Sequence, residues 1–337
     1  MRLLVIRLSA LGDVALLQPV LRARAEANAD VTFLIAAPAL LQPLFADISN
    51  VEFVSTPRHL AAAEMAALWD SLAPDAVADL HGIPRVRRAL RCLRRLHPGH
   101  LPVAHVTKNR IGRWRLTRRW MKCMTPLPEA WRRYDDVFTA CHLNPAPALS
   151  RDAAHCWKPK ANHSGRHLIG LAPGAQHAGK RWPSHHVEAL IADLSKRGDC
   201  DLLLFGGPDE RNQMEVWAAH YPHTRSLAAT GSFADEMEAI RQLDVMVCMD
   251  SANMHFASIQ GVPVVSLWGA THPAAGFYGW RQNSAWAVQL PLHCRPCSAY
   301  GQRRCRYGDY RCLDRINPEQ VKEKIDSLLV GKKEREG

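Results

Sequence analysis

Short apolar runs alternate with longer helical patterns along most of the chain. In the first half, the apolar runs predict strands and the 3.6-residue patterns predict helices between them. The predicted strands are Leu3–Leu8, Val31–Ala36, Val51–Val54 and Ala76–Leu80, and the predicted helices include Ala15–Ala27 and Leu60–Leu72. Such alternation is typical of a mostly parallel sheet with helices on both faces.

The same alternation restarts in the second half, after a polar and weakly patterned stretch at Asn144–Gly165. The predicted strands are His167–Ala172, Asp201–Phe205, Val245–Met249 and Val264–Leu267, and the predicted helices are Ser184–Arg197, Asp209–Ala219 and Phe233–Leu243. A chain of 337 residues exceeds what one core usually serves. We therefore expect two α/β domains, at 1–150 and 165–315, followed by a C-terminal helix and tail at 316–337.

No apolar run approaches the roughly 20 residues needed to cross a bilayer. The N-terminus also lacks the small-residue cleavage site of a signal peptide. We therefore expect a cytoplasmic protein. The ten cysteines should then be mostly reduced.

Positive charge is concentrated in residues 80–128. This segment holds thirteen Lys and Arg residues and no Asp or Glu, whereas the net charge of the whole chain is +11. It could attract nucleic acid, an anionic membrane surface, or a phosphorylated or carboxylated substrate; the alternative is a pair of solvated arginine-rich helices. The absence of acids favours a binding role. Nucleic acid is the least favoured partner, because Trp114 and Trp120 are almost the only interleaved aromatics and no nucleic-acid motif accompanies them.

Residues 245–267 combine a clear secondary-structure pattern with candidate binding residues. An apolar strand runs into Asp250 and Ser251, which are typical N-cap residues, and then into a helix that carries His255. Gly261 and Pro263 end that helix before the next strand. The pattern predicts a strand-helix-strand unit with polar groups at the carboxyl end of its strands, where open α/β sheets bind ligands.

Two further turns in the second half combine glycine with polar residues, at 173–183 and 206–210. Glycine lets backbone amides approach a phosphate, and Lys180 adds a mobile positive charge. Glu210 suits ribose hydroxyls, whereas Asp250 and Ser251 suit a diphosphate or a sugar. Each turn alone is weak evidence for a binding site, but three such turns at one edge of the predicted sheet indicate one. His255 is included because it lies one helical turn from Ser251.

The first half offers one comparable turn, with Ser9 and Asp13 as its polar side chains. Asp13 either caps the following helix or faces a cleft. In the second case its carboxylate could act as a general base towards an acceptor hydroxyl.

These segments resemble the bacterial ADP-heptose:lipopolysaccharide heptosyltransferases, glycosyltransferase family 9. The resemblance covers almost the full length, in the right order. It rests on Arg7–Asp13, Pro173–Gly174 with Lys180–Pro183, Gly206–Glu210, Asp250–His255 and Trp268–Thr271. It implies a GT-B fold, in which an N-terminal acceptor domain and a C-terminal nucleotide-sugar domain, both Rossmann-like, face a cleft.

The resemblance also implies site residues. Asp13 matches the proposed catalytic base, Lys180 the diphosphate-binding lysine and Glu210 the ribose-binding acid. Donor-binding candidates are Lys180, Glu210, Asp250, Ser251, Ala252 and His255, and acceptor-binding candidates are Ser9, Arg85 and Arg88. Ala252 stands where better-known members have glycine, so the donor is less well determined than the fold.

The implied reaction is an inverting displacement that moves a heptose from ADP-heptose to the inner core of lipopolysaccharide, without a metal. The implied partners are the nucleotide sugar and an anionic glycolipid, with peripheral contact at the inner membrane through the basic segment. Alternatives are another nucleotide sugar acting on a different surface glycan, or a polyanion-binding or nucleic-acid-binding protein.

Four cysteines at the C-terminal side form the sharpest remaining pattern. Cys294, Cys297, Cys305 and Cys312 could form a structural zinc site, with His293 beside them. The alternative is a loop of reduced or adventitiously paired thiols. Because related glycosyltransferases resemble the chain here without needing zinc for the reaction, we favour the metal-free alternative.

Overall fold

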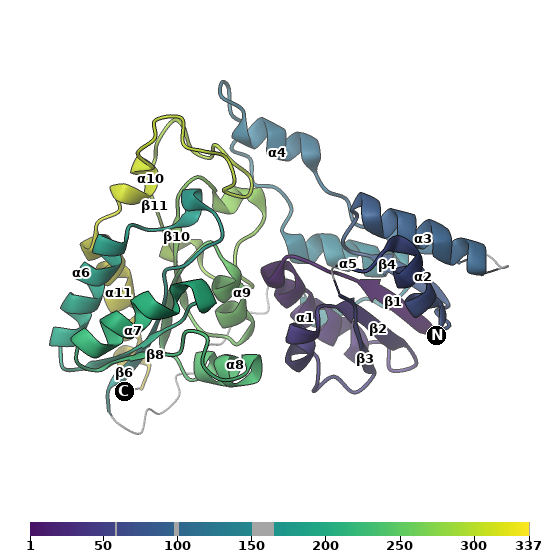
Figure 1. The fold of residues 1–337 in the computed structure, drawn as a ribbon, viewed down its shortest axis with the longest axis horizontal. Helices are drawn as coiled ribbons and strands as arrows, with labels where there is room; N and C mark the ends of the chain where they lie inside the picture. The colour runs from purple at the N-terminus through teal and green to yellow at the C-terminus, as the bar shows by residue number, and fades with distance from the viewer. Residues whose placement is uncertain (58, 98–100, 150–164, 337) are drawn as a thin grey trace. The chain divides into compact units, whose positions relative to one another are not determined.

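The computed structural model describes residues 1–57, 59–97, 101–149 and 165–336. Contacts divide the chain into two compact units (Figure 1). Unit 1 comprises residues 1–109 and 128–154, and unit 2 comprises residues 110–127 and 155–337. The predicted connection at 144–165 lies largely outside the described residues. None of the described helices is both long and apolar enough to cross a membrane.

Unit 1 contains a five-stranded parallel sheet in the order β3-β2-β1-β4-β5. Its strands are β1 (Arg2–Ile6), β2 (Thr32–Ala37), β3 (Val51–Ser55), β4 (Ala76–Asp79) and β5 (Val103–His105). Its helices are α1 (Leu11–Glu26), α2 (Ala62–Asp70), α3 (Pro84–Leu96) and α5 (Ala130–Ala140), with 3₁₀ turns at Ala39–Leu44 and Pro147–Leu149.

Alternate residues of the unit 1 strands pack against different helices, because successive side chains point to opposite faces of a sheet. Leu4 and Ile6 of β1 belong to a core that includes Trp69 of α2 and Leu90 of α3. Helices α1 and α5 pack together, and the Phe33 ring of β2 meets a ring of α5 edge-on. The sheet is therefore covered on both faces, which explains its nearly continuous apolar strands.

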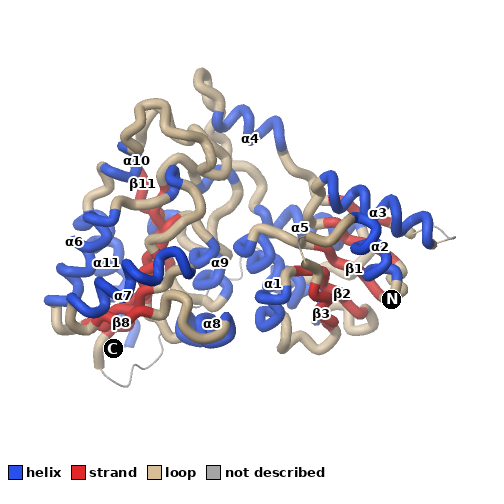
Figure 2. The backbone as a smooth tube through the Cα atoms, in the orientation of Figure 1, coloured by secondary structure: helices blue, strands red, loops and turns tan. Residues whose placement is uncertain are grey.

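Unit 2 contains a six-stranded parallel sheet in the order β11-β10-β9-β6-β7-β8 (Figure 2). Its strands are β6 (His167–Ala172), β7 (Cys200–Leu204), β8 (Thr224–Ser226), β9 (Val245–Met249), β10 (Val264–Trp268) and β11 (Ala287–Gln289). Its helices are α4 (Arg110–Thr117), α6 (Ser184–Lys196), α7 (Arg211–His220), α8 (Phe233–Arg241), α9 (Ala252–Ile259), α10 (Arg311–Asp314) and α11 (Pro318–Glu336). Short 3₁₀ turns lie at Ala178–Lys180, Pro208–Glu210, Pro273–Ala275 and Ser284–Trp286.

The core of unit 2 lies between its central strands and helices α6 and α11. Leu171 of β6 and Val247 of β9 belong to the same buried cluster as Leu190 of α6 and Ile325 of α11. The Trp182 indole N–H donates to the Ile316 backbone oxygen at 3.1 Å, which ties the turn before α6 to the chain before α11. The C-terminal helix is thus part of this unit rather than an appendage.

Residues 110–127 belong to unit 2, although they lie within the first half of the sequence. Leu116 of α4 is buried against Ala274 and Ala275, and the Leu127 N–H donates to the Ala274 oxygen at 2.9 Å. The chain then returns to unit 1 as α5. The predicted domain range 1–150 includes this segment, whereas the structure groups it with unit 2. The predicted class of two doubly wound α/β sheets is confirmed.

Candidate active site

Each sheet has one point at which the strand order reverses. In unit 1 the chain runs outward from β1 to β3 and then resumes beside β1 as β4, and in unit 2 it does the same from β6 to β8 and then β9. The loops after these neighbouring strands diverge to opposite faces, which opens a crevice at the carboxyl edge of the sheet. The candidate site of each unit lies on the loops at this edge.

In unit 2, an ion pair joins the two loops at this point. Lys180 ends the 3₁₀ turn after β6, and Asp250 directly follows β9. The Lys180 Nζ lies 2.8 Å from the Asp250 Oδ2, and the carboxylate is buried. The backbone of Gly301, with φ +83°, packs against the aliphatic part of Lys180. The ammonium group is therefore held at the crevice rather than left to move freely.

The start of α9 adds an anion-binding geometry beside this pair. Ser251 is the N-cap residue of α9, and Ala252 is the first residue of the helix. The Ser251 hydroxyl is buried and has no hydrogen-bond partner among the described residues. Free backbone N–H groups at a helix start and an unsatisfied hydroxyl together favour a bound phosphate oxygen. His255 is buried one turn further along α9.

Glu210 approaches the loop after β6 from the loop after β7. Its Oε2 accepts a hydrogen bond from the Gly207 N–H at 2.9 Å. A Cβ atom on Gly174 would lie 1.9 Å from the Glu210 Oε1, so only glycine leaves room for the carboxylate there. Glu210, Gly174 and Lys180 therefore occupy neighbouring loops at one sheet edge, as the sequence predicted.

Asp13 is the centre of the corresponding site in unit 1. It lies in the first turn of α1, whose N-cap residue is Ala10, and its Oδ2 accepts a hydrogen bond from the Ala10 N–H at 3.4 Å, so Asp13 also caps the start of the helix. Its carboxylate forms an ion pair with Arg7 and accepts a hydrogen bond from the Tyr134 hydroxyl at 3.2 Å. Burial is the main cause that raises the pKa of Tyr134, which keeps this phenol a hydrogen-bond donor. The Ala10 N–H, the Arg7 guanidinium and the Tyr134 hydroxyl thus orient the carboxylate.

Ser9 and His81 connect the two loops of the unit 1 crevice. The Ser9 hydroxyl lies 3.1 Å from the His81 Nε2, and the Leu8 N–H donates to the His81 Nδ1 at 3.1 Å. Burial and then the Arg7 charge lower the pKa of His81 to about 4. The imidazole is therefore neutral at physiological pH. Because Nδ1 accepts a hydrogen bond from the Leu8 N–H, Nε2 carries the ring proton and donates to the Ser9 hydroxyl.

Cations surround the same edge of unit 1. Arg85 lies in the first turn of α3, and its buried Nε has no hydrogen-bond partner among the described residues. A Cβ atom on Gly82 would lie 3.2 Å from the Lys108 Cε, which places Lys108 against the loop after β4. Arg88, one turn after Arg85, is exposed. Unit 1 therefore presents a carboxylate and a hydroxyl among positive charges.

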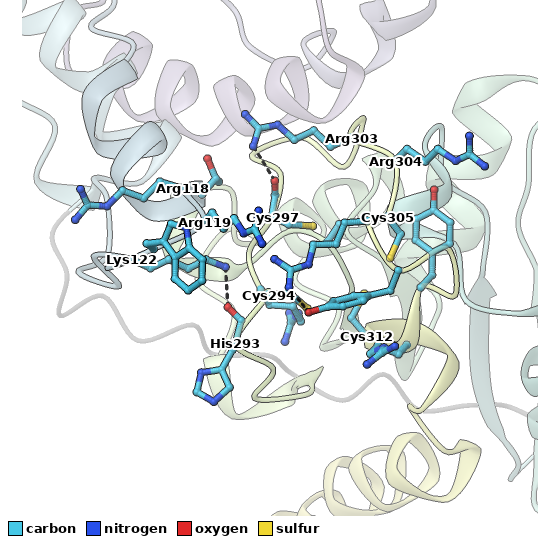
Figure 3. A pocket seen from close by; sticks show the side chains of 18 of the residues that line it. Arg118, Arg119, Lys122, His293, Cys294, Cys297, Arg303, Arg304, Cys305 and Cys312 are labelled. Carbon is cyan, nitrogen blue, oxygen red and sulfur yellow. Dashed lines mark hydrogen bonds between the residues drawn. The ribbon is translucent and has the colours of Figure 1, made fainter.

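The four cysteines of the zinc prediction line one cavity of unit 2, of about 640 Å³ (Figure 3). All four are free thiols. In the described part of the chain, one group of three or more potential metal ligands has its ligand atoms within 4.8 Å of one another: His185, His186 and Asp314. The thiols do not form such a group, and the preference for a metal-free loop over a zinc site stays a prediction.

Sequence reasoning overlooked several residues at these edges. His81 was not selected, although it directly follows a predicted strand, as Ser9 and Asp250 do. Tyr134 lies 121 positions from Asp13, and nothing local in the sequence connects the two. In unit 2, Thr271 follows β10 and has a buried hydroxyl without a partner among the described residues. Its position after a strand end was the available signal.

Comparison with known proteins identifies the family of the chain. The model of glycosyltransferase family 9 (heptosyltransferase) matches residues 131–308. A curated relative, lipopolysaccharide heptosyltransferase 2 of Salmonella typhimurium, is 29% identical over 176 residues, which are 49% of this chain and 48% of the relative. The chain thus spans about half the length of the curated relatives that it matches.

Solved structures match over nearly the whole chain. A family 9 glycosyl transferase from Veillonella parvula has a TM-score of 0.71 at 18% identity, with 98% of this chain and 97% of that chain covered. The E. coli heptosyltransferase WaaC with ADP has a TM-score of 0.70 at 18% identity, with 97% and 100% covered. At these identities, the likeness establishes the fold.

Proposed function

Because the chain belongs to glycosyltransferase family 9, we propose that it is an inverting transferase that moves a heptose from ADP-heptose to an inner-core lipopolysaccharide acceptor. The observation that carries the proposal is the Lys180–Asp250 pair at the strand-order reversal of unit 2, beside the unsatisfied Ser251 hydroxyl. Lipopolysaccharide heptosyltransferases among the curated relatives and ADP bound to a protein of the same fold support this choice of donor and acceptor.

The donor would bind at the carboxyl edge of the unit 2 sheet. Lys180 and the backbone amides at the start of α9 would hold the diphosphate, and Glu210 would accept hydrogen bonds from the ribose hydroxyls. The same groups would stabilise the negative charge that develops as the diphosphate leaves. Because Asp250 holds Lys180 in place, little reorganisation is needed when that charge appears.

Asp13 would act as the general base. Its carboxylate would take the proton of an acceptor hydroxyl while the acceptor oxygen attacks the anomeric carbon of the donor. The bond from that carbon to the diphosphate oxygen breaks, ADP leaves, and the proton passes from Asp13 to solvent. Ser9, Arg85 and Arg88 would bind the acceptor, whose phosphate and carboxylate groups complement the arginines.

The proposed reaction needs no metal, because Lys180 and the α9 amides supply the positive charge at the diphosphate. Transfer is therefore expected to continue at an unchanged rate after dialysis against EDTA. Loss of transfer on chelation, restored by a divalent cation, would contradict this part of the proposal. The zinc content of the purified protein, measured by mass spectrometry before and after chelation, separates a structural zinc from a catalytic one.

The proposal places the protein in the cytoplasm, with its glycolipid acceptor presented at the inner membrane surface. A membrane-bound acceptor requires at least transient contact between the protein and the bilayer. The positive charges of α3 and α4 fit this requirement, because the cytoplasmic leaflet is negatively charged.

Calorimetric titration with ADP, UDP and GDP tests the donor class, and a transfer assay with ADP-heptose tests the reaction. We expect ADP to bind at least tenfold more tightly than the other two. Tighter binding of UDP or GDP would favour the alternative of a different nucleotide sugar on the same fold. No binding of any nucleotide diphosphate would overturn the proposal.

A further inference from the structure

Exposed apolar side chains of the described residues gather on one segment of unit 2. Ile111, Trp114, Trp120, Met121 and Met124 are all exposed within fourteen positions, with Trp120 at 70% and Met121 at 81%. Tyr300 and Tyr307 are exposed on the loop 293–311 of the same unit. Side chains of this size contribute little to folding when they face water, so a cluster of them indicates an interaction surface.

Positive charges are interleaved with these side chains and line the cavity beside them. The cavity is bounded by Arg118, Arg119 and Lys122 from the segment after α4, and by Arg303, Arg304, Arg306 and Arg311 from the loop 293–311 (Figure 3). No acidic side chain lines it. Of these seven cations, Arg311 alone forms an ion pair with a carboxylate among the described residues, that of Asp309 at 2.8 Å.

The segment is fixed on unit 2 with these side chains outward. The Lys122 ammonium donates to the His293 backbone oxygen at 3.0 Å, and the Arg113 guanidinium lies 4.9 Å from the centre of the Phe277 ring. Burial is the main cause that lowers the pKa of Lys122; Cys297 and Cys294 oppose this shift, and the weaker effects of the Arg295 and Arg306 charges add to it. An anion in the cavity would relieve this repulsion.

We propose that residues 110–124 and the loop 293–311 of unit 2 form a docking surface for an anionic lipid bilayer. Trp114, Trp120 and Met121 would enter the boundary between headgroups and acyl chains, where tryptophan is favoured. Arginines of the cavity, such as Arg119 and Arg304, would bind headgroup phosphates. The inference deepens the proposed function, whose acceptor is a glycolipid, by assigning the membrane contact to unit 2 and not to the acceptor site of unit 1.

The apolar residues favour a bilayer over nucleic acid as the occupant. A single-stranded nucleic acid would use the tryptophans for stacking and the arginines for phosphates. It would gain nothing from Ile111, Met121 and Met124, whose side chains are aliphatic and exposed. Of these two occupants, the bilayer is the one that accounts for both kinds of side chain on this surface.

Flotation of the full-length protein with lipid vesicles tests the inference. We expect binding to phosphatidylcholine vesicles that contain phosphatidylglycerol, and little binding to phosphatidylcholine alone. The double variant Arg119→Gln/Arg304→Gln should partition about 30-fold more weakly, since each basic residue contributes about a factor of five at an anionic surface. Trp120→Ser/Met121→Ser should weaken binding at least tenfold at the same net charge.

Matched substitutions elsewhere on unit 2 provide the controls. Lys196→Gln/Arg225→Gln removes two exposed positive charges outside the surface, and Val216→Ser removes an exposed apolar side chain of α7. Both controls should bind vesicles within a factor of two or three of the wild type. If the charge control weakens binding as much as the arginine variant, attraction by net charge explains the result and the inference is wrong. If Val216→Ser weakens binding as much as the tryptophan variant, the apolar contribution is not specific to this surface and the inference is likewise wrong.

Three further outcomes separate this inference from the proposed function. A protein that binds ADP and transfers heptose to a delipidated acceptor, but does not bind anionic vesicles, overturns the inference alone. Equal binding to neutral and anionic vesicles overturns the phosphate-binding role of the arginines. Tighter binding to a single-stranded oligonucleotide than to vesicles, lost in the same variants, would reassign the surface. If the tryptophan variant fails to fold, the arginine variant still decides the question.

Discussion

The two units share a strand order but differ in which charge they leave accessible. Each carries an ion pair at its strand-order reversal, Arg7–Asp13 in unit 1 and Lys180–Asp250 in unit 2. In unit 1 the acid is the more exposed member, at 21% against 11% for the arginine. In unit 2 the cation is the more exposed member, at 17% against 7% for the aspartate. The more accessible charge of the pair is therefore a carboxylate in unit 1 and an ammonium in unit 2.

Removal of the unit 1 carboxylate should give the largest effect. Asp13→Asn keeps the size of the side chain and an acceptor for Tyr134, but the amide cannot take a proton. We expect transfer to slow about a thousandfold, within the range of general-base catalysis, while the Kd for ADP is unchanged. A coupled assay of ADP release gives kcat, and calorimetry gives the Kd.

Asp47→Asn is the matched control for Asp13. Asp47 is an exposed acid of unit 1 that pairs with Arg22 at 2.6 Å. Its loss should leave the transfer rate within a factor of two. Full activity of the Asp13→Asn protein would show that the more exposed member of the unit 1 pair is not the base. It would then contradict the contrast between the accessible charges of the two units.

His81 should make the stability of unit 1 depend on pH. Its pKa is about 4 in the folded protein and rises to its ordinary value of 6.5 on unfolding. The unfolded chain therefore binds more protons between pH 6.5 and pH 4, and stability falls as the pH falls through this window. The difference corresponds to about 3 kcal/mol of unfolding free energy.

Urea unfolding of the wild type and of His81→Asn at pH 7 and pH 5 measures this contribution. The asparagine oxygen can accept the Leu8 N–H but does not titrate, so the variant should lose less stability on acidification. His272 of unit 2 also has its pKa lowered to about 4, mainly by burial. His272→Asn should therefore give a comparable change in slope for unit 2, and equal slopes in all three proteins would contradict both assignments.

The longer strands and the residues at their carboxyl ends could be predicted from the sequence. Asp13, Lys180, Glu210 and Asp250 each follow a predicted strand, and the carboxyl ends of parallel strands share one edge. The partners of these residues could not be predicted in the same way. Tyr134 reaches Asp13 from α5, and that contact depends on how α5 packs against α1 after the excursion of residues 110–127 into unit 2.

The short strands at the edges of the sheets could not be predicted from the sequence either. Strands β5, β8 and β11 have three residues each, too few to show a period. The only buried apolar side chain among the described residues of α4 is Leu116, which lies among mostly polar neighbours and packs against Ala274 and Ala275 of unit 2. A hydrophobic pattern cannot identify the partner of a single apolar side chain.

Loss of the unit 2 cation should weaken donor binding more than it slows chemistry at saturation. We expect Lys180→Ala to raise the Kd for ADP about 10-fold to 100-fold, because hydrogen bonds to charged groups contribute about 1.5–3 kcal/mol. Asp250→Asn keeps the lysine but removes the charge that fixes it, so a smaller increase of about fivefold is expected. Lys196→Gln, an exposed lysine of α6, is the control and should leave the Kd unchanged. An effect of Asp250→Asn larger than that of Lys180→Ala would mean that the aspartate itself meets the donor.

Gly174→Ala should test how the loop after β6 and the loop after β7 cooperate in binding the donor. The added methyl group would lie 1.9 Å from the Glu210 carboxylate, which must move, although the chain can still fold because that carboxylate is the far end of a flexible side chain. We expect ADP binding to weaken about tenfold, or about 1.4 kcal/mol, and Glu210→Ala to weaken it by a similar amount. If the glycine acts only by admitting the carboxylate, the double variant should be no weaker than either single variant. Calorimetry on all four proteins measures this cycle. Additive losses would mean that Gly174 meets the donor through its own backbone, so that the ribose and diphosphate contacts of unit 2 are independent of each other.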